Sequence, residues 1–290
     1  MDFYLSAIAL ALATSMMAWG VYLSVRIFNL PDITTDGSFT LSAAITAVVL
    51  MAGNPWYIAV VAGIAGGVLA GMITAFIHAW LGVNALLSGI LVMTALYSVN
   101  LTVMGRSNIP LLETDNIFTA IEFTTNVYLN YFFVVLLIAT IVFLLMRWFL
   151  LTDFGLALRA TGQSEKMVST MGISVNRMKL AGLGIANGLT AFSASLITQM
   201  QQFADINMGI GIVIFGLGAV MIGESLQKLS GQNGIGFQLL MVLIGCLLFR
   251  LIMAFTLASG VDPNLMKLFN ATVVLVFVSL PVIRKKLLAR

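Results

Sequence analysis

The stretch GSFTLSAAITAVVLMAGNPWYIAVVAGIAGGVLAGMITAFIHAWLGVNALLSGILVMTALYSVNLTVMG (Gly37–Gly105) contains no Asp, Glu, Lys or Arg. A helix crosses the hydrocarbon core of a bilayer with about 20 apolar residues, so this stretch must hold several crossings. The whole chain has 290 residues, of which 60% are hydrophobic and only 9% are charged, whereas soluble domains carry about 25% charged residues. The sequence therefore predicts an all-α, polytopic helical membrane protein that forms a single transmembrane domain over residues 1–290.

Apolar runs separated by turn residues predict about nine transmembrane helices, with eight to ten compatible with the pattern. The predicted spans are Phe3–Val25, Ser38–Gly53, Trp56–Trp80, Val83–Met104, Tyr131–Leu150, Leu180–Gln199, Met208–Ile222, Ile235–Ala258 and Leu265–Ile283. The second and seventh spans are short, as are the discontinuous helices that flank substrate paths in transporters. Glu224 follows the seventh span and is expected in a solvated loop.

The distribution of basic residues predicts the orientation of these spans, because Lys and Arg accumulate in cytoplasmic loops. Nine spans place the two termini on opposite sides of the membrane. With the C-terminus inside, most basic residues also fall inside: Arg26, Arg147, Arg159, Lys166, Arg177, Lys179, Lys228, Arg284, Lys285, Lys286 and Arg290. We therefore expect the N-terminus outside and the C-terminus in the cytoplasm. The loop 105–130, which carries Glu113, Asp115 and Glu122 against Arg106, is then extracytoplasmic. The net charge of +3 reflects this bias and predicts no nucleic-acid partner.

The segment DFGLALRATGQSEKMVSTMGISVNRMK (Asp153–Lys179) interrupts the apolar pattern with six charges and is expected in the cytoplasm. Ser164 can cap a helix with Glu165 in its first turn, and Gly172 suits the left-handed position just after its end. Such a helix has about two turns and is unstable alone, so it must gain its order by packing. Met167, Val168 and Met171 are predicted to share one face, which could pack under the bundle or fill a groove on a separate protein. Physical reasoning leaves both possibilities open.

The same segment and the span after it resemble the permeases of branched-chain amino acid and ribose-type ABC importers. The matching residues are Gly155, Ala157, Arg159, Ala160, Gly172, Ile173, Arg177 and Lys179. LPDITTDGSF and NALLSGILVMTALYSVNL further resemble the tryptophan-type or uncharacterised branch of that family. The family is bacterial, and the resemblance places this chain in the cytoplasmic (inner) membrane.

The resemblance implies that 153–179 is a coupling segment, which docks on a separate ATPase subunit. The residues implied in coupling are Arg159, Ser164, Glu165, Met167, Val168, Met171 and Gly172. Glu165 and Lys166 are expected to be solvated charges at the rim of that contact. The further implied partners are an extracytoplasmic substrate-binding protein and a second permease copy, in a homodimer. The implied substrate is an amino acid, with an aromatic one preferred.

The chain is not expected to be an enzyme. A Walker A motif needs Gly-Lys followed by Ser or Thr, so that backbone amides and the lysine hold the phosphates, and no lysine here follows a glycine. ATP and Mg²⁺ are therefore expected on the partner ATPase, with no cofactor on this chain. One His and one Cys predict no metal site, and no nucleophile–base constellation supports an intramembrane enzyme.

Polar residues near two span ends are candidates for the substrate pathway. Asp32, Thr35, Asp36 and Ser38 could form a solvated loop, with an Asp36-Gly37 turn and Ser38 as a helix cap, or the start of a broken helix that lines the path. Asn84, Ser88 and Thr94 are expected on a shared stripe, either as interhelical contacts or as a pathway wall, and we favour the wall.

The alternative function is an ion-coupled secondary transporter of small polar solutes. That mechanism needs acidic residues well inside spans. The acids of this sequence are expected in loops or near span ends, which favours the importer.

Overall fold

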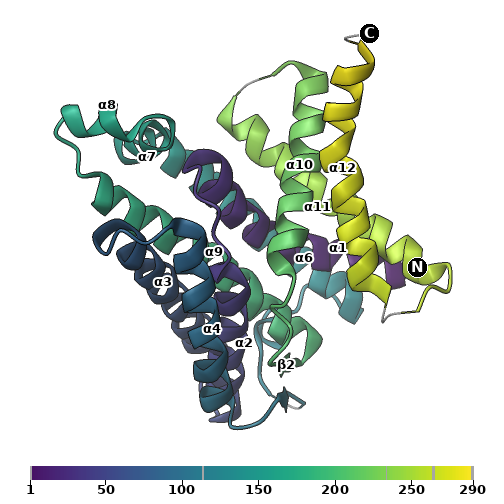
Figure 1. Cartoon of the computed structure of the whole chain (residues 1–290). Helices are drawn as coiled ribbons and strands as arrows, with labels where there is room; N and C mark the ends of the chain where they lie inside the picture. Colours follow the sequence, from purple (N-terminus) through teal and green to yellow (C-terminus); the bar gives the residue numbers. More distant parts are fainter. Residues whose placement is uncertain (1, 113, 233, 263–264, 289–290) are drawn as a thin grey trace.

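The structure is a computed structural model that describes residues 2–112, 114–232, 234–262 and 265–288 (Figure 1). Glu113 and Arg290 lie outside the described residues. The helices are α1 (Asp2–Tyr22), continued by the π-helix η1 (Leu23–Ile27), α2 (Thr34–Met51), α3 (Trp56–Trp80), α4 (Ala85–Met104), α5 (Ile117–Ala120), α6 (Val127–Leu151), α7 (Asp153–Gln163), α8 (Glu165–Thr170), α9 (Val175–Gln201), α10 (Ile212–Ser230), α11 (Ile235–Ala258) and α12 (Met266–Leu288). The two strands are β1 (Asn108–Pro110) and β2 (Phe203–Asp205).

The prediction of a polytopic helical membrane protein is confirmed. Eight helices in the described part of the chain are long and apolar enough to cross a bilayer, and α12 contains a further apolar stretch, Leu268–Phe277. About nine spans are compatible with this arrangement. In Figure 1, α12 starts near the beginning of α1 and ends at the top of the view, across α10 and α11 from α7 and α8.

The predicted boundaries hold best where the apolar runs are uninterrupted. The spans Trp56–Trp80 and Ile235–Ala258 coincide with α3 and α11. The two short spans differ: α2 begins four residues before Ser38, and α10 begins four residues after Met208 and continues beyond Ile222. The prediction that Glu224 lies in a solvated loop is therefore wrong, because it belongs to α10 and forms an ion pair with Arg26.

Helix α1 lies at the centre of the bundle, between a group formed by α2, α3, α4 and α9 and a group formed by α6, α10, α11 and α12 (Figure 1). It contacts α9 on one side and α6, α10 and α11 on the other. Trp19 is fully buried there, and its indole N–H donates to the carbonyl of Leu239 at 3.0 Å. A helix that is apolar all round, as α1 is, gains stability from burial on every face.

The short helix α2 begins inside the bundle rather than at its surface. Three hydrogen bonds join it to α9 at a constant sequence offset, so the two helices run parallel: Ser38 to Asn187, Ser42 to Ala191 and Thr46 to Ser195. Asn187 lies 12 residues into α9, or about 18 Å along its axis at 1.5 Å per residue. The first turn of α2 is therefore level with the middle of α9.

Helix α10 also begins within the bundle. The segment before it folds back from β2, and the Gly209 N–H donates to the Thr40 hydroxyl at 3.1 Å. The N-termini of α2 and α10 consequently lie next to each other, although the two helices run in opposite directions.

The loop 105–130 is structured and lies at the end of the bundle opposite α7 and α8 (Figure 1). Its strand β1 pairs antiparallel with β2, with Ile109 opposite Ala204. The side chain of Gln199 accepts from the Ile117 N–H at 3.0 Å, and the Asn130 amide donates to Phe118 at 2.8 Å. These contacts fix the loop to α9 and α6.

Candidate functional site

Helix α7 opens the charged segment and is held close to the end of η1. Thr152 caps it by accepting from the Gly155 N–H at 3.3 Å, and Leu158 is fully buried beneath it. At Gly162 the backbones approach so closely that a methyl group would overlap the carbonyl oxygen of Ile27. Only glycine leaves room for this contact, which fixes α7 against the central helix.

The predicted two-turn helix is confirmed as α8. The Ser164 hydroxyl accepts from the Met167 N–H at 3.3 Å and so caps the helix, with Glu165 in the first turn. Gly172 adopts φ +79° just after the end of α8, which is the left-handed conformation expected there. The local sequence was sufficient to place these boundaries because caps act within a few residues.

The prediction that Met167, Val168 and Met171 share one face is wrong for Val168. Val168 is fully buried, whereas Met167 and Met171 are 54% and 65% exposed. Adjacent helical residues are separated by about 100°, so Val168 points inward and seats the helix while the two methionines, four residues apart, project outward together.

Glu165 is exposed, as expected for a solvated charge, but it also forms an ion pair with the bundle. Its carboxylate accepts from the Lys179 ammonium at 2.8 Å, and that lysine is 7% exposed. The Lys179 nitrogen also lies 3.3 Å from Nε2 of His78, whose Nδ1 is 2.8 Å from the carbonyl oxygen of Val83. A chain of polar contacts thus links α8 through α9 to the end of α3. Lys166 is exposed, as expected.

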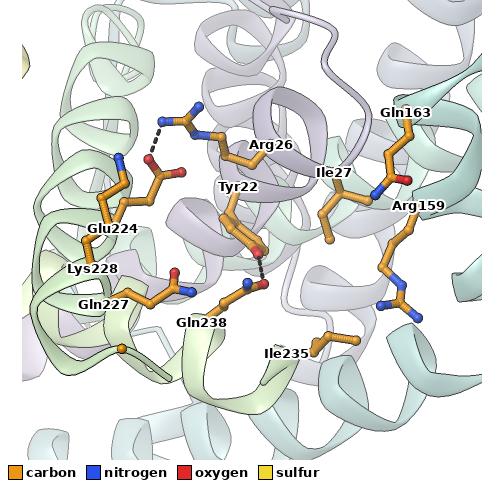
Figure 2. Close-up of a pocket in the computed structure, with 12 residues that line it drawn as sticks. Tyr22, Arg26, Ile27, Arg159, Gln163, Glu224, Gln227, Lys228, Ile235 and Gln238 are labelled. Carbon is orange, nitrogen blue, oxygen red and sulfur yellow. Dashed lines mark hydrogen bonds and ion pairs between the residues drawn. The ribbon is translucent and has the colours of Figure 1, made fainter. Parts of the chain in front are cut away.

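Arg159 of α7 does not lie with the exposed methionines. It lines a polar cavity of about 770 Å³ between α7, α1 with η1, and the α10–α11 hairpin (Figure 2). Across this cavity, Arg26 is paired with Glu224, and the Tyr22 hydroxyl donates to Oε1 of Gln238 at 2.6 Å.

The structure brings Asp32 together with Thr35 and Ser38 at the buried start of α2. Asp32 is 5% exposed, its Oδ1 accepts from the Thr34 N–H at 2.9 Å, and its Oδ2 accepts from the Asn187 amide at 2.6 Å. Ser38 donates to the other end of that amide at 2.7 Å. The solvated loop with a Ser38 cap is therefore wrong, because Asp32 and Ser38 are buried and Ser38 lies inside α2. That this helix start lines the substrate path stays a prediction.

Asp36 connects α2 to α10. Its carboxylate accepts from the backbone N–H groups of Gly211 and Val213, each at 2.9 Å. These are unpaired donors of the first turn of α10, where the helix dipole also favours a negative charge. The expected Asp36-Gly37 turn is wrong, because both residues lie within α2.

The position of Asp32 corrects a further expectation. Acidic residues were expected only in loops and near span ends, yet the buried Asp32 carboxylate lies beside the middle of α9, and the half-buried Asp36 carboxylate lies at the start of α10. The sequence argument against ion coupling assumed that no acidic residue lies well inside the bundle, and the structure contradicts that assumption.

The predicted stripe on α4 is divided between two faces. Asn84 caps the helix by accepting from the Leu86 N–H at 2.9 Å, and Ser88 is buried. Thr94 is exposed, and its hydroxyl donates to the Ile90 carbonyl at 2.7 Å. A shared face at four-residue spacing runs through residues 84, 88 and 92, and Thr94 is about 200° away from position 92.

Sequence reasoning missed the polar residues of α9 and α3 that complete the network. They are Asn187, Ser195 and Gln199 on α9 and Thr74 on α3, whose hydroxyl is 2.7 Å from that of Thr34. A signal was available: polar residues recur at four-residue spacing in α2, at 38, 42 and 46, and on the same spacing in α9 at 187, 195 and 199, where Ala191 interrupts the row. Among the described residues, no group of three or more His, Cys, Asp or Glu is placed to hold a metal.

The arrangement of helices is similar to that of a solved ABC transporter. A solved structure described as an inward-facing conformation of an ABC transporter matches 97% of this chain and 85% of its own, with a TM-score of 0.52 and 15% sequence identity. At this identity the likeness concerns the fold.

Sequence comparison defines the family. The model of the branched-chain amino acid transport system permease component matches residues 3–279, so the chain belongs to this permease family and is a transport protein. A tyrosine transport system permease protein of Clostridioides difficile (strain R20291) is 34% identical over 95% of this chain and 90% of its own length. An uncharacterised protein of Rickettsia prowazekii (strain Madrid E) is 31% identical over 99% of both chains.

Proposed function

We propose that this chain is the membrane-spanning subunit of an ATP-driven, binding-protein-dependent importer of an amino acid. Its family membership supports the class, and the likeness to a tyrosine transport permease supports an aromatic substrate. ATP and Mg²⁺ bind on separate ATPase subunits in this proposal. The location is the bacterial inner membrane, with the N-terminus outside and the C-terminus in the cytoplasm.

The observation that carries the proposal is the outward face of α8. Two methionines, Met167 and Met171, are exposed on a helix that Val168 and the Glu165–Lys179 pair hold in place. Methionine is flexible and polarizable, and it is common at surfaces that bind a partner helix or groove. We propose that this face fills a groove on the ATPase, and that Ser164 and Gly172 set the length of the inserted helix.

Movement of the docked α8 would reach the centre of the bundle along two routes. The first runs through Lys179 into α9, which carries the Asn187 contact to Asp32 and Ser38. The second runs through α7, where Gly162 packs against Ile27 at the end of the central helix. Packed elements of this kind transmit displacement because they rearrange between discrete arrangements.

We place the substrate pathway along α4 and the inner ends of α2 and α10. The outward face of α4 carries hydroxyls at Thr94, Ser98 and Thr102, at four-residue spacing, and all three are exposed in the single chain. In a dimer of two copies, this face would meet the partner across the pathway. Asp32, Thr35, Asp36 and Ser38, with Asn84 and Ser88 at the start of α4, would form its inner wall when α2 and α10 separate.

The loop 105–130 is proposed to receive the substrate-binding protein. Asp115 lines a cavity of about 700 Å³ formed with the α2–α3 turn, and Trp56 and Thr119 are part of the same wall. A carboxylate at the edge of such a surface orients the approaching protein more than it adds affinity.

The proposal is tested by co-purifying the permease with its ATPase. Met167→Asp and Met171→Asp should each release most of the ATPase, because a charge would be buried without a partner in the interface. Ser169→Asp is the matched control, since it adds the same charge to an exposed position of α8 and should retain the ATPase. Retention of the ATPase by both methionine variants, with normal transport, would show that α8 is not the docking element.

A further inference from the structure

The polar cavity behind α7 has the size and construction of a ligand site. Its volume of about 770 Å³ lies within the roughly 300–1,000 Å³ of small-molecule sites. Three separate parts of the chain form it (Figure 2): Tyr22, Arg26 and Ile27 from α1 and η1, Arg159, Gly162 and Gln163 from α7, and Glu224, Lys228, Ile235 and Gln238 from the α10–α11 hairpin.

The charge of the cavity favours an anion. Arg26, Arg159 and Lys228 line it against a single carboxylate, that of Glu224, which is paired with Arg26. Arg159 lies on the α7 side of the cavity, across from Glu224 and Lys228 (Figure 2). Its Nε is buried and has no hydrogen-bond partner in the described part of the chain. A buried donor without a partner is costly, and an anionic oxygen in the cavity would satisfy it.

The walls of this cavity are fixed by two local features. Gly162, one turn after Arg159, packs against the backbone of Ile27 and so sets the position of the arginine. Arg26 lies in η1, a π-helical turn at the end of α1, and π-helical turns are frequent at functional sites. The guanidinium groups are therefore held on opposite walls.

An apolar groove adjoins the cavity. Ile235 lines both, and the groove continues for about 470 Å³ along Phe143, Arg147 and Leu151 of α6 and Gly236, Phe237 and Leu240 at the start of α11. Leu151 and Leu240 are exposed at 58% and 40%, so the groove is open toward the membrane side of the bundle. The neighbouring Trp148 is 68% exposed, and tryptophan is enriched where a helix meets the membrane interface.

We propose that the cavity and the groove together bind an anionic phospholipid, with the phosphate between Arg159 and Lys228 and an acyl chain in the groove. Basic pockets between transmembrane helices at the membrane surface are suited to anionic headgroups. A soluble phosphate compound shares the headgroup chemistry but has no use for the apolar groove. The lipid would bridge α7 to the α10–α11 hairpin and stabilise the seat of the coupling segment.

Native mass spectrometry of the delipidated full-length permease tests this proposal directly. Phosphatidylglycerol should bind with 1:1 saturation and markedly tighter than phosphatidylcholine with the same acyl chains. Arg159→Gln and Lys228→Gln should each weaken phosphatidylglycerol binding roughly tenfold, the loss expected for one charge-assisted contact. Arg177→Gln removes an exposed charge at the start of α9 and is the matched control that should bind normally.

Four results would overturn the proposal. Equal binding of the two lipids would show that the headgroup charge is not recognised. Competition by glycerol phosphate at the same concentration as phosphatidylglycerol would identify the ligand as a soluble phosphate compound. Unchanged lipid binding by Lys228→Gln, whose exposed side chain is not needed for folding, would place the lipid elsewhere. Release of the ATPase by Arg159→Gln with lipid binding intact would show that the cavity is a contact for the ATPase. Because lipid binding is measured without ATPase or transport, its failure is distinguishable from failure of the importer proposal.

Discussion

At the scale of single residues, the centre of the bundle depends on Asp32 and the amide of Asn187. Asp32 forms no salt bridge in the described part of the chain. Its buried carboxylate relies instead on hydrogen bonds from the Thr34 N–H and the Asn187 amide. The same amide accepts from Ser38 through its oxygen. Burying a carboxylate is costly unless its oxygens are hydrogen-bonded, so these contacts should couple strongly.

An exchange of the two side chains tests that coupling. Asp32→Asn should lower both thermal stability and transport. Both oxygens of Asp32 accept hydrogen bonds, and in the variant an NH₂ group replaces one of them and faces the N–H of Thr34 or of Asn187. Asn187→Asp should do the same by placing two carboxylates together. The double variant restores a donor–acceptor pair and should recover part of the loss, with an interaction energy of about 0.5–3 kcal/mol. Thermal unfolding of the four proteins measures it, and simple additivity of the two losses would contradict the contact.

Asp36 gives a second prediction at this scale. Asp36→Asn keeps one acceptor for the first turn of α10, whereas Asp36→Ala leaves the Gly211 and Val213 N–H groups without theirs. We expect a graded loss of thermal stability, with alanine costing about 0.5–2 kcal/mol as for other helix caps. Asp153→Ala is the control, since Asp153 is also acidic in a first turn but is exposed on α7. Equal effects of Asp36→Ala and Asp153→Ala would contradict the cap.

The sequence indicated part of this network. Asp32 and Asp36 stand out because charges are rare nearby, but their partners are distant: Asn187 follows Asp32 by 155 residues. The four-residue spacing of polar residues predicts a polar ridge on each helix, yet only the register of α2 against α9 decides which ridge residues meet. That register depends on packing across the whole bundle.

At the scale of elements, α8 shows which features are local. Its limits follow from Ser164 and Gly172 and could be predicted from a few residues. The inward direction of Val168 could not, because neighbouring residues at 167, 168 and 171 span a wide arc of the helix, and the side that faces inward is set by where α7 and α9 lie.

The contact between α7 and η1 should be intolerant of even one methyl group. Gly162→Ala would overlap the Ile27 carbonyl and displace α7, so we expect a lower melting temperature and weaker retention of the ATPase. Gly234→Ala is the control, because that glycine has open space around it and a φ of −69°. Thermal unfolding and co-purification measure the two effects, and equal behaviour of the two variants would show that the α7–η1 approach is unimportant.

At the scale of the whole molecule, hydropathy predicted the helical membrane fold and most spans, because the length of an apolar run determines whether it can cross a bilayer. Hydropathy predicted the starts of α2 and α10 least well, because both helices begin inside the bundle. There the side chains of Asp32 and Asp36 accept hydrogen bonds from backbone N–H groups that lack a partner within the helix. The burial of Asp32 is also the observation that bears on the ion-coupled alternative, which needs acids inside the membrane.

Reconstituted transport distinguishes these mechanisms most directly. The permease is placed in proteoliposomes with its ATPase and substrate-binding protein, and uptake of a radiolabelled aromatic amino acid is followed with ATP on the ATPase side. The importer account predicts that uptake requires ATP hydrolysis and continues when ionophores collapse the proton and sodium gradients. Uptake by the permease alone, driven by either gradient without ATP, would contradict it.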